Sequence, residues 1–195
     1  MNETSIKEDS RILRSKRDLA NALEELLQEK NLDDISITEI TKRAMVSKNT
    51  FYNNFEDKSS LLNFLFRRYA IQLDQTIKKI LDNKTDDKEA NLYECAKAIV
   101  HFFYSSKLSF EKIVKSDKSK NLYWAVNAFI KDIVEEIINR YSEYFNQNLP
   151  QNLIGYVYAG AISNMIYYMY NEETSVSEDE CIQYIYNLLT RPVLK

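Results

Sequence analysis

Glycine and proline are almost absent from this chain, and their scarcity limits its fold more than any other feature of the sequence. The 195 residues include two glycines and two prolines, where average usage would supply about 14 and 10. Sheets and barrels need many tight turns, which depend on Gly, Pro, Asn or Asp at set positions. No glycine precedes Gly155, which excludes the glycine-rich loops that bind nucleotide phosphates. The sequence therefore predicts an all-α protein.

The overall charge hides a difference between the two ends of the chain. The net charge of −3 argues against a nucleic-acid partner when taken alone. Residues 1–70 nevertheless hold 12 basic and 12 acidic residues, so the acidic excess lies entirely in residues 71–195. The two cysteines, Cys95 and Cys181, are far apart and no signal peptide precedes them, which favours a reducing cytoplasmic location. No apolar run approaches 18 residues, so no membrane span is predicted.

Cap residues and apolar periodicity predict about nine helices. The first follows a loose polar arm at residues 1–10. Two capping boxes, Ser36 with Glu39 and Ser177 with Glu180, mark the starts of a short helix and of the last helix. The predicted helices run from residue 12 to about residue 29, over 37–44 and 48–55, onward from 57–60 as a long helix, and near 87–104, 107–116, 119–146, 150–171 and 178–190.

Two short helices joined by a three-residue turn, after one longer helix, are typical of a helix-turn-helix. The second short helix, capped by Ser47, reads KNTFYNN from residue 48. Its Asn, Thr, Tyr and Lys side chains can bind base edges or phosphates, and it contains no acid. The same residues would also suit a solvated helix that packs through Phe51 and Phe55. Composition leaves these two interpretations open.

The run AMVSKNTFY at residues 44–52, followed by Phe55, Lys58 and Leu61-Leu62, resembles the TetR-type transcriptional regulators. The resemblance covers about residues 8–68. It implies a helix-turn-helix DNA-binding domain over 8–68 and a larger helical domain for effector binding and dimerisation over 69–195. Position by position, it implies DNA contacts by Thr38, Lys48, Asn49, Thr50, Tyr52, Asn53, Asn54 and Lys58, with Tyr52 and Lys58 at phosphate-binding positions.

The sequence departs from the family pattern in the turn between the two short helices. The family usually has Gly where Met45 stands, and often Gly where Asn49 stands. A left-handed backbone at Met45 would cost about 1 kcal/mol relative to glycine. Met45 is therefore the position at which the resemblance is most open to test.

A basic strip lies at the start of the first predicted helix. Arg11, Arg14, Lys16 and Arg17 fall within seven residues, with no acid among them. Basic segments of this kind can neutralise DNA phosphates. A solvated, charged helix end is the alternative interpretation.

Most of the aromatic residues lie after residue 88, where they could line an apolar effector pocket or form an ordinary core. His101 and Cys95 are six residues apart and do not share a helix face, so neither a metal site nor another cofactor is predicted. The residues predicted for the pocket are Phe102, Phe103, Phe110, Tyr123 and Trp124.

The predicted helix over 150–171 is apolar nearly all round, and such helices are buried. Its small residues recur every four positions, so a second helix could approach closely. Together with the last helix it is expected to form a four-helix bundle with a second copy of the chain, as family members do. A core helix within one chain is the alternative. The predicted interface residues are Gly155, Ala159, Ser163, Ile166, Ile182 and Ile185.

The sequence thus predicts a ligand-responsive transcriptional regulator and not an enzyme. Its expected partners are double-stranded operator DNA of palindromic sequence, an unidentified small-molecule effector and a second copy of the chain, with repression as the outcome. One alternative keeps the fold but acts through a protein partner, as a TetR-like coactivator or adaptor that does not bind DNA. A second alternative is an enzyme or small-molecule carrier built from the aromatic helices.

Overall fold

The computed structural model describes residues 3–83, 87–105, 107–114, 120–145, 148–170 and 176–191, and over these residues the protein contains helices and no strands. The all-α prediction is therefore confirmed. Contacts divide the chain into two compact units. The first comprises Met1–Tyr69 with Glu111–Asn121, and the second comprises Ala70–Phe110 with Leu122–Lys195.

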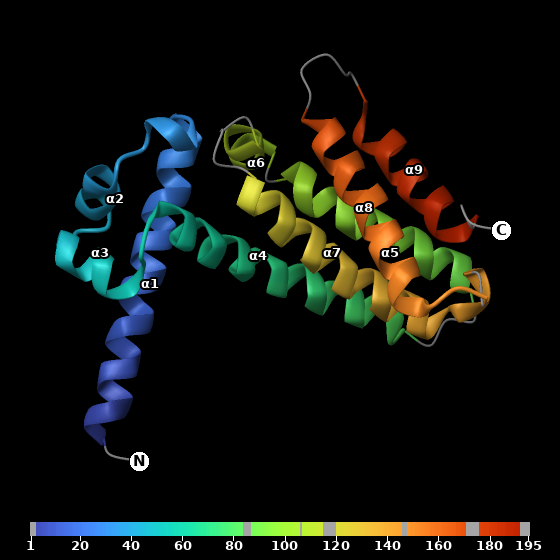
Figure 1. Cartoon of the computed structure of the whole chain (residues 1–195), viewed down its shortest axis with the longest axis horizontal. Helices are drawn as coiled ribbons and strands as arrows, with labels where there is room; N and C mark the ends of the chain where they lie inside the picture. The colour runs from blue at the N-terminus through green and yellow to red at the C-terminus, as the bar shows by residue number, and fades with distance from the viewer. Residues whose placement is uncertain are drawn as a thin grey trace. The chain divides into compact units, whose positions relative to one another are not determined.

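The first unit contains α1 (Glu3–Glu29), the short 3-10 helix η1 (Leu32–Asp34), α2 (Ile37–Arg43), α3 (Lys48–Asn54) and the beginning of α4 (Lys58–Leu81). Helix α1 packs against both α2 and α3 (Figure 1). Apolar side chains from all four helices meet in one core and exclude water from it. The fully buried members are Leu19, Leu23 and Leu27 of α1, Ile40 of α2, Phe51 of α3 and Leu61 of α4.

The second unit contains the rest of α4, α5 (Lys88–Ser105), the beginning of α6 (Lys107–Val114), α7 (Lys120–Arg140), the 3-10 helix η3 (Ser142–Tyr144), α8 (Gln151–Met169) and α9 (Glu178–Thr190). Helices α5 and α9 run antiparallel. His101 lies 2.9 Å from Glu178 at one end, and the rings of Tyr93 and Tyr186 lie 5.5 Å apart nearer the other. Among the described residues, no helix is long and apolar enough to cross a bilayer.

Two predicted boundaries are wrong. Residues 3–10 are not a loose arm, because α1 already begins at Glu3; the segment lacks Gly and Pro, and an acidic first turn suits the positive end of the helix dipole. Helix α7 ends at Arg140 and not at residue 146. Tyr141 leaves the helix with φ −131° and ψ 49°, and its hydroxyl accepts a hydrogen bond from buried Asn91 at 3.0 Å.

Candidate nucleic-acid interface

The start of α2 is fixed by the predicted capping box. The Ser36 hydroxyl accepts the Glu39 N–H at 3.2 Å, and the Glu39 carboxylate accepts the Ser36 N–H at 2.9 Å. Glu39 also pairs with Lys30, next to the end of α1. The hydrogen bond from Lys30, followed by those from Ser36, lowers the pKa of Glu39 to about 2. The box therefore ties α2 to the segment that follows α1.

Met45 adopts the left-handed conformation that the family usually assigns to glycine, with φ 55°. The Met45 N–H donates to the Lys42 carbonyl at 3.2 Å, and the Val46 N–H donates to the Thr41 carbonyl at 3.0 Å. This pair of bonds is a Schellman motif, which ends a helix with a left-handed residue. Since the Met45 side chain is 93% exposed, it adds no packing that would offset the backbone strain. The turn keeps its geometry without glycine.

Helix α3 is held by a cap and by two phenylalanines. The Ser47 hydroxyl accepts the Thr50 N–H at 3.0 Å, as the sequence predicts. Phe51 and Phe55 are buried with ring centroids 6.0 Å apart, and Phe55 also meets Phe64 of α4 at 5.5 Å. The inner row predicted from the helical period is confirmed. Its anchoring determines which side chains of α3 face solvent.

The outer face of α3 consists of exposed polar side chains from Lys48, Asn49, Tyr52 and Asn53. Tyr52 is 57% exposed, although its ring edge meets Phe51 at 5.4 Å. No acid lies within α3. A helix of this width fits the major groove of B-DNA, where amide side chains read adenine and hydroxyls reach phosphates.

Two other residues of the predicted set point partly inward. Thr50 is half-buried, and its hydroxyl lies 2.9 Å from that of Ser47. Asn54 is also half-buried and turns its amide back to donate to the Thr50 carbonyl at 2.7 Å. The Asn54 Oδ1 atom is buried without a partner, so its side chain is better placed to close the helix than to face a ligand.

Lys58 and Thr38 lie outside α3. The Lys58 ammonium donates to the Ile35 carbonyl at 2.6 Å and also to the Leu32 carbonyl. It therefore fastens the loop before α2 to the start of α4. Thr38 is half-buried on α2, and its carbonyl accepts from the Thr41 hydroxyl at 3.1 Å. The Lys58 link has no signature in the sequence because its acceptors are backbone atoms 23 and 26 residues earlier.

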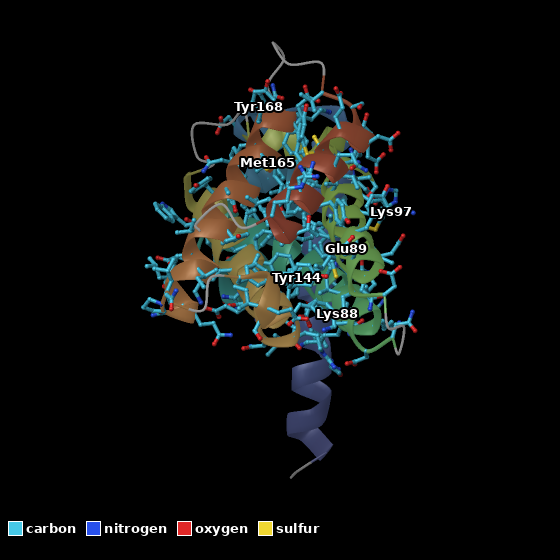
Figure 2. The ribbon with its side chains drawn as sticks, turned by 90° about the vertical axis from the view of Figure 1, so that its right-hand side faces the viewer. Lys88, Glu89, Lys97, Tyr144, Met165 and Tyr168 are labelled. Atoms are coloured by element: carbon cyan, nitrogen blue, oxygen red, sulfur yellow. The ribbon has the colours of Figure 1, made fainter. Side chains whose placement is uncertain are left out.

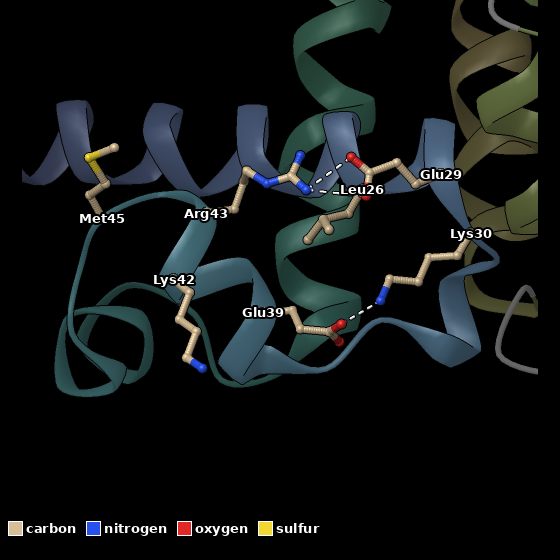
Figure 3. A pocket seen from close by; sticks show the side chains of 7 residues that line it. All are labelled: Leu26, Glu29, Lys30, Glu39, Lys42, Arg43 and Met45. Carbon is tan, nitrogen blue, oxygen red and sulfur yellow. Dashed lines mark hydrogen bonds and ion pairs between the residues drawn. The ribbon is translucent and has the colours of Figure 1, made fainter.

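Ion pairs add a second connection between α1 and α2. The Arg43 guanidinium lies 2.9 Å from Glu29 and 3.3 Å from Glu25, and Figure 3 shows it beside the Lys30–Glu39 pair. These groups surround an open hollow of about 420 Å³. The residues that line it are Leu26, Glu29, Lys30, Glu39, Lys42, Arg43 and Met45. Its charges largely satisfy one another, and none of the aromatic residues predicted to bind an effector lines it.

Those aromatic residues form two groups of ring contacts in the second unit. Phe103 and Phe110 are buried with centroids 5.2 Å apart, and half-buried Phe102 meets Phe103 at 4.9 Å. Tyr123 meets Trp124 at 5.3 Å and Tyr167 at 5.0 Å. Trp124 is 68% exposed, so it presents its ring to solvent. Across the described residues, no group of His, Cys, Asp or Glu is placed to hold a metal ion.

The small-residue strip of α8 packs inside its own chain. Ser163 accepts a hydrogen bond from Asn127 of α7 at 3.4 Å, and a Cβ built on Gly155 would lie 3.0 Å from Glu135 of α7. Residues buried in one chain have no surface left for a second copy, so this side of α8 is not a dimer interface. All six residues predicted for the dimer interface are buried within the chain, so that prediction is wrong for each of them: Gly155, Ala159, Ser163, Ile166, Ile182 and Ile185.

The first unit thus has the architecture of a helix-turn-helix domain, with a polar second helix facing solvent. Residues 19–64 match the family model described as bacterial regulatory proteins, tetR family. A relative, the HTH-type transcriptional regulator EthR of Mycobacterium tuberculosis, is 33% identical over 70 residues, or 36% of this chain. The chain matches about a third of that relative's length, namely 32%. Over these residues the chain therefore carries a helix-turn-helix domain similar to that of the tetR family of bacterial regulatory proteins.

Solved structures extend the likeness of fold over nearly the whole chain. The fatty acid degradation regulator FadR from Bacillus halodurans has a TM-score of 0.70 at 17% identity, covering 92% of this chain and 96% of FadR. RolR in complex with resorcinol has a TM-score of 0.67 at 17% identity, covering 93% of this chain and 88% of RolR. At these identities the likeness concerns the fold alone.

Proposed function

We propose that the protein binds operator DNA through α3. The observation that supports this most directly is the exposed, acid-free outer face of α3, positioned by the Ser47 cap, the Met45 turn and the buried phenylalanines. Lys48, Asn49, Tyr52 and Asn53 supply the contacts to bases and phosphates in this proposal. Residues 8–68 then form the DNA-binding domain, and residues 69–195 form the effector-binding and dimerisation domain.

The proposed active form is a homodimer. A dimer places two recognition helices in successive major grooves about 34–36 Å apart, which requires a near-palindromic operator. The exposed side of α8, opposite the strip that faces α7, offers apolar surface for a second copy, and α9 adds to it. Figure 2 shows Met165 and Tyr168 on α8. The exposed large apolar residues there are Leu153, Tyr156, Val157 and Tyr168 of α8, with Tyr184 of α9.

The proposed signal is a small molecule bound in the second unit. RolR, which has a similar fold, is known with resorcinol bound, and the aromatic groups around Phe103 and Tyr123 offer rings on which a flat apolar ligand packs. A ligand that binds more tightly to one spacing of the two recognition helices than to another changes operator affinity. The change is limited by the difference between the ligand's binding free energies for the two spacings. We expect repression in the cytoplasm, relieved by the ligand.

Selection from a random pool of duplex DNA tests the proposal. The expected result is enrichment of a near-palindromic sequence, and the wild-type protein then protects that sequence in a footprint. A double variant, Asn49→Ala with Asn53→Ala, should lose the selectivity, while a control variant changing exposed Asn139 and Asn152 of the second unit to Ala should keep it. Failure of the wild type to enrich any sequence, with a protein partner co-purifying, would instead support the adaptor alternative.

A further inference from the structure

The first half of α1 extends beyond the core of its own unit. The buried residues of α1 begin at Leu19, whereas the helix begins at Glu3. Among residues 10–18, whose side chains the structure describes, none is buried. At 1.5 Å per residue, the segment ahead of Leu19 is about 24 Å long. In Figure 1 it continues past α3 as a straight helix.

This projecting segment presents an arginine strip, defined as Arg11, Arg14 and Arg17. The three residues recur every third position and therefore lie within about 120° of the helix circumference. All three are exposed. The Nε atom of Arg14 lies 4.0 Å from the Asp18 carboxylate, too far for a hydrogen bond. For Arg11 and Arg17, no hydrogen bond or ion pair is shown to any described residue.

Other arginines of the same unit are used differently. Arg43 is paired with Glu25 and Glu29, and Arg68 donates to Asn21 at 2.6 Å and to Glu24 at 2.7 Å. Those guanidinium groups stabilise the domain from within. Among the residues whose side chains the structure describes, the arginine strip makes no comparable hydrogen bonds, and its planar guanidinium groups match the geometry of phosphate oxygens.

The segment that carries the strip also lies near the proposed recognition helix. Lys16, on the same segment, places its ammonium 6.0 Å from the ring centre of Phe55, the residue that ends α3. Arg11 and Arg17 are about 9 Å apart along the helix axis. Because each strand of duplex DNA carries one phosphate per roughly 3.4 Å of the duplex axis, that length spans about three phosphates of one strand. Three arginines at this spacing are therefore within range of several phosphates at once.

We propose that the arginine strip binds the phosphate backbone of DNA beside the segment read by α3, so that α1 acts as a second, sequence-independent DNA contact. The inference rests on the proposed function of α3. A helical strip holds its three guanidinium groups at fixed spacing, which reduces the conformational entropy lost on binding compared with a loose arm.

The test compares two triple variants of the full-length protein on the selected operator. One carries Arg11→Gln, Arg14→Gln and Arg17→Gln. The matched control carries Lys79→Gln, Lys97→Gln and Arg191→Gln, three exposed residues whose loss changes the net charge equally. Operator affinity is measured from 50 to 300 mM salt, and footprints are recorded for both. A third variant carries Arg11→Lys, Arg14→Lys and Arg17→Lys and retains the charge.

The strip variant should weaken operator binding roughly tenfold or more and reduce the salt slope by about 5, near 0.9 for each of the roughly six phosphate contacts that the two strips of a dimer lose. Its footprint should shorten at the flanks while the central protection remains. The control and the lysine variant should keep the wild-type slope. Equal losses in the strip variant and the control, or an unchanged slope in the strip variant, would overturn the inference.

Two results separate this inference from its alternatives. If the wild-type protein selects no DNA, the proposed function of α3 itself fails. Exposed Ile12 and Leu13 would also suit an anionic lipid surface. Binding of the wild type to phosphatidylserine vesicles, lost in the strip variant while operator affinity is unchanged, would overturn the assignment to DNA.

Discussion

Tyr52 and Lys58 have matching positions in the family pattern but different surroundings here. Tyr52 is mostly exposed, whereas the Lys58 ammonium donates to the backbone of the loop before α2. We expect Tyr52→Ala to weaken operator binding at least tenfold with little change in unfolding. Lys58→Met should lower the free energy of unfolding by about 1–3 kcal/mol, since its buried carbonyl partners lose a charged donor.

Gel shifts and urea unfolding on the same preparations distinguish the two residues. A Tyr52→Phe variant is the matched control, because it keeps the ring against Phe51 and removes the hydroxyl. If Lys58→Met unfolds at the wild-type urea concentration but binds DNA poorly, Lys58 serves DNA and not the fold. Unchanged affinity in Tyr52→Ala would remove this residue from the interface.

Met45 combines a left-handed backbone with an exposed side chain. Met45→Gly should stabilise the first unit by about 0.5–1 kcal/mol. The substitution relieves roughly 1–2 kcal/mol of backbone strain, which outweighs the roughly 0.5–1 kcal/mol that the greater entropy of glycine in the unfolded chain costs. Met45→Ala keeps the Cβ atom and should change little. Urea unfolding of the three proteins provides the measurement, and a glycine variant less stable than the alanine variant would contradict the strain.

At the scale of elements, the junction between α1 and α2 makes the first unit sensitive to acid. The pKa of Glu39 is lowered from 4.5 to about 2, first by the hydrogen bond from Lys30. A carboxyl with a depressed pKa contributes stability above its unfolded pKa and loses it as pH falls through its folded pKa. The contribution of Glu39 should therefore be complete above about pH 5 and disappear between pH 4.5 and about pH 2.

Thermal unfolding between pH 7 and pH 2 checks this expectation. Glu39→Gln should lower the melting temperature at neutral pH and converge toward the wild type at the acid end. Glu180, in the second capping box, also has a lowered pKa, from its hydrogen bonds with Ser177, so Glu180→Gln is a matched control in the other unit. Coincident pH profiles for wild type and Glu39→Gln would show that the Glu39 contacts contribute nothing.

The helices could be predicted from sequence where their signals are local. Ser36, Ser47 and Ser177 each cap the helix that the pattern assigns to them, because a cap depends on residues within one turn. The inner row of α3 followed from helical period in the same way. The link from Lys58 to Ile35 could not be predicted, since backbone acceptors carry no sequence signal. Helix α8 was oriented wrongly because a helix apolar on every side does not indicate which side faces its own chain.

The two glycines show how this ambiguity is resolved at the scale of the whole molecule. Gly155 faces Glu135 within the chain, whereas a Cβ added at Gly160 would meet nothing within 4 Å. Gly160 lies three residues after Val157 and four after Tyr156, which is 60% exposed, so it falls on the exposed apolar side of α8. In the proposed homodimer, a missing side chain at this point lets the backbones of two α8 helices approach closely.

Gly160→Leu should therefore weaken the dimer without unfolding the chain. A leucine here has open space in one chain and improves helix propensity by roughly 0.5–1 kcal/mol, yet it would hold the paired helices apart. Analytical ultracentrifugation over a range of concentrations should show at least a tenfold rise in the dimer dissociation constant, with unchanged helicity. Asn139→Leu, an exposed position on α7, is the control. If Gly160→Leu dimerises like the wild type, the second copy docks on another surface, and the spacing of the two α3 helices must be derived from that surface instead.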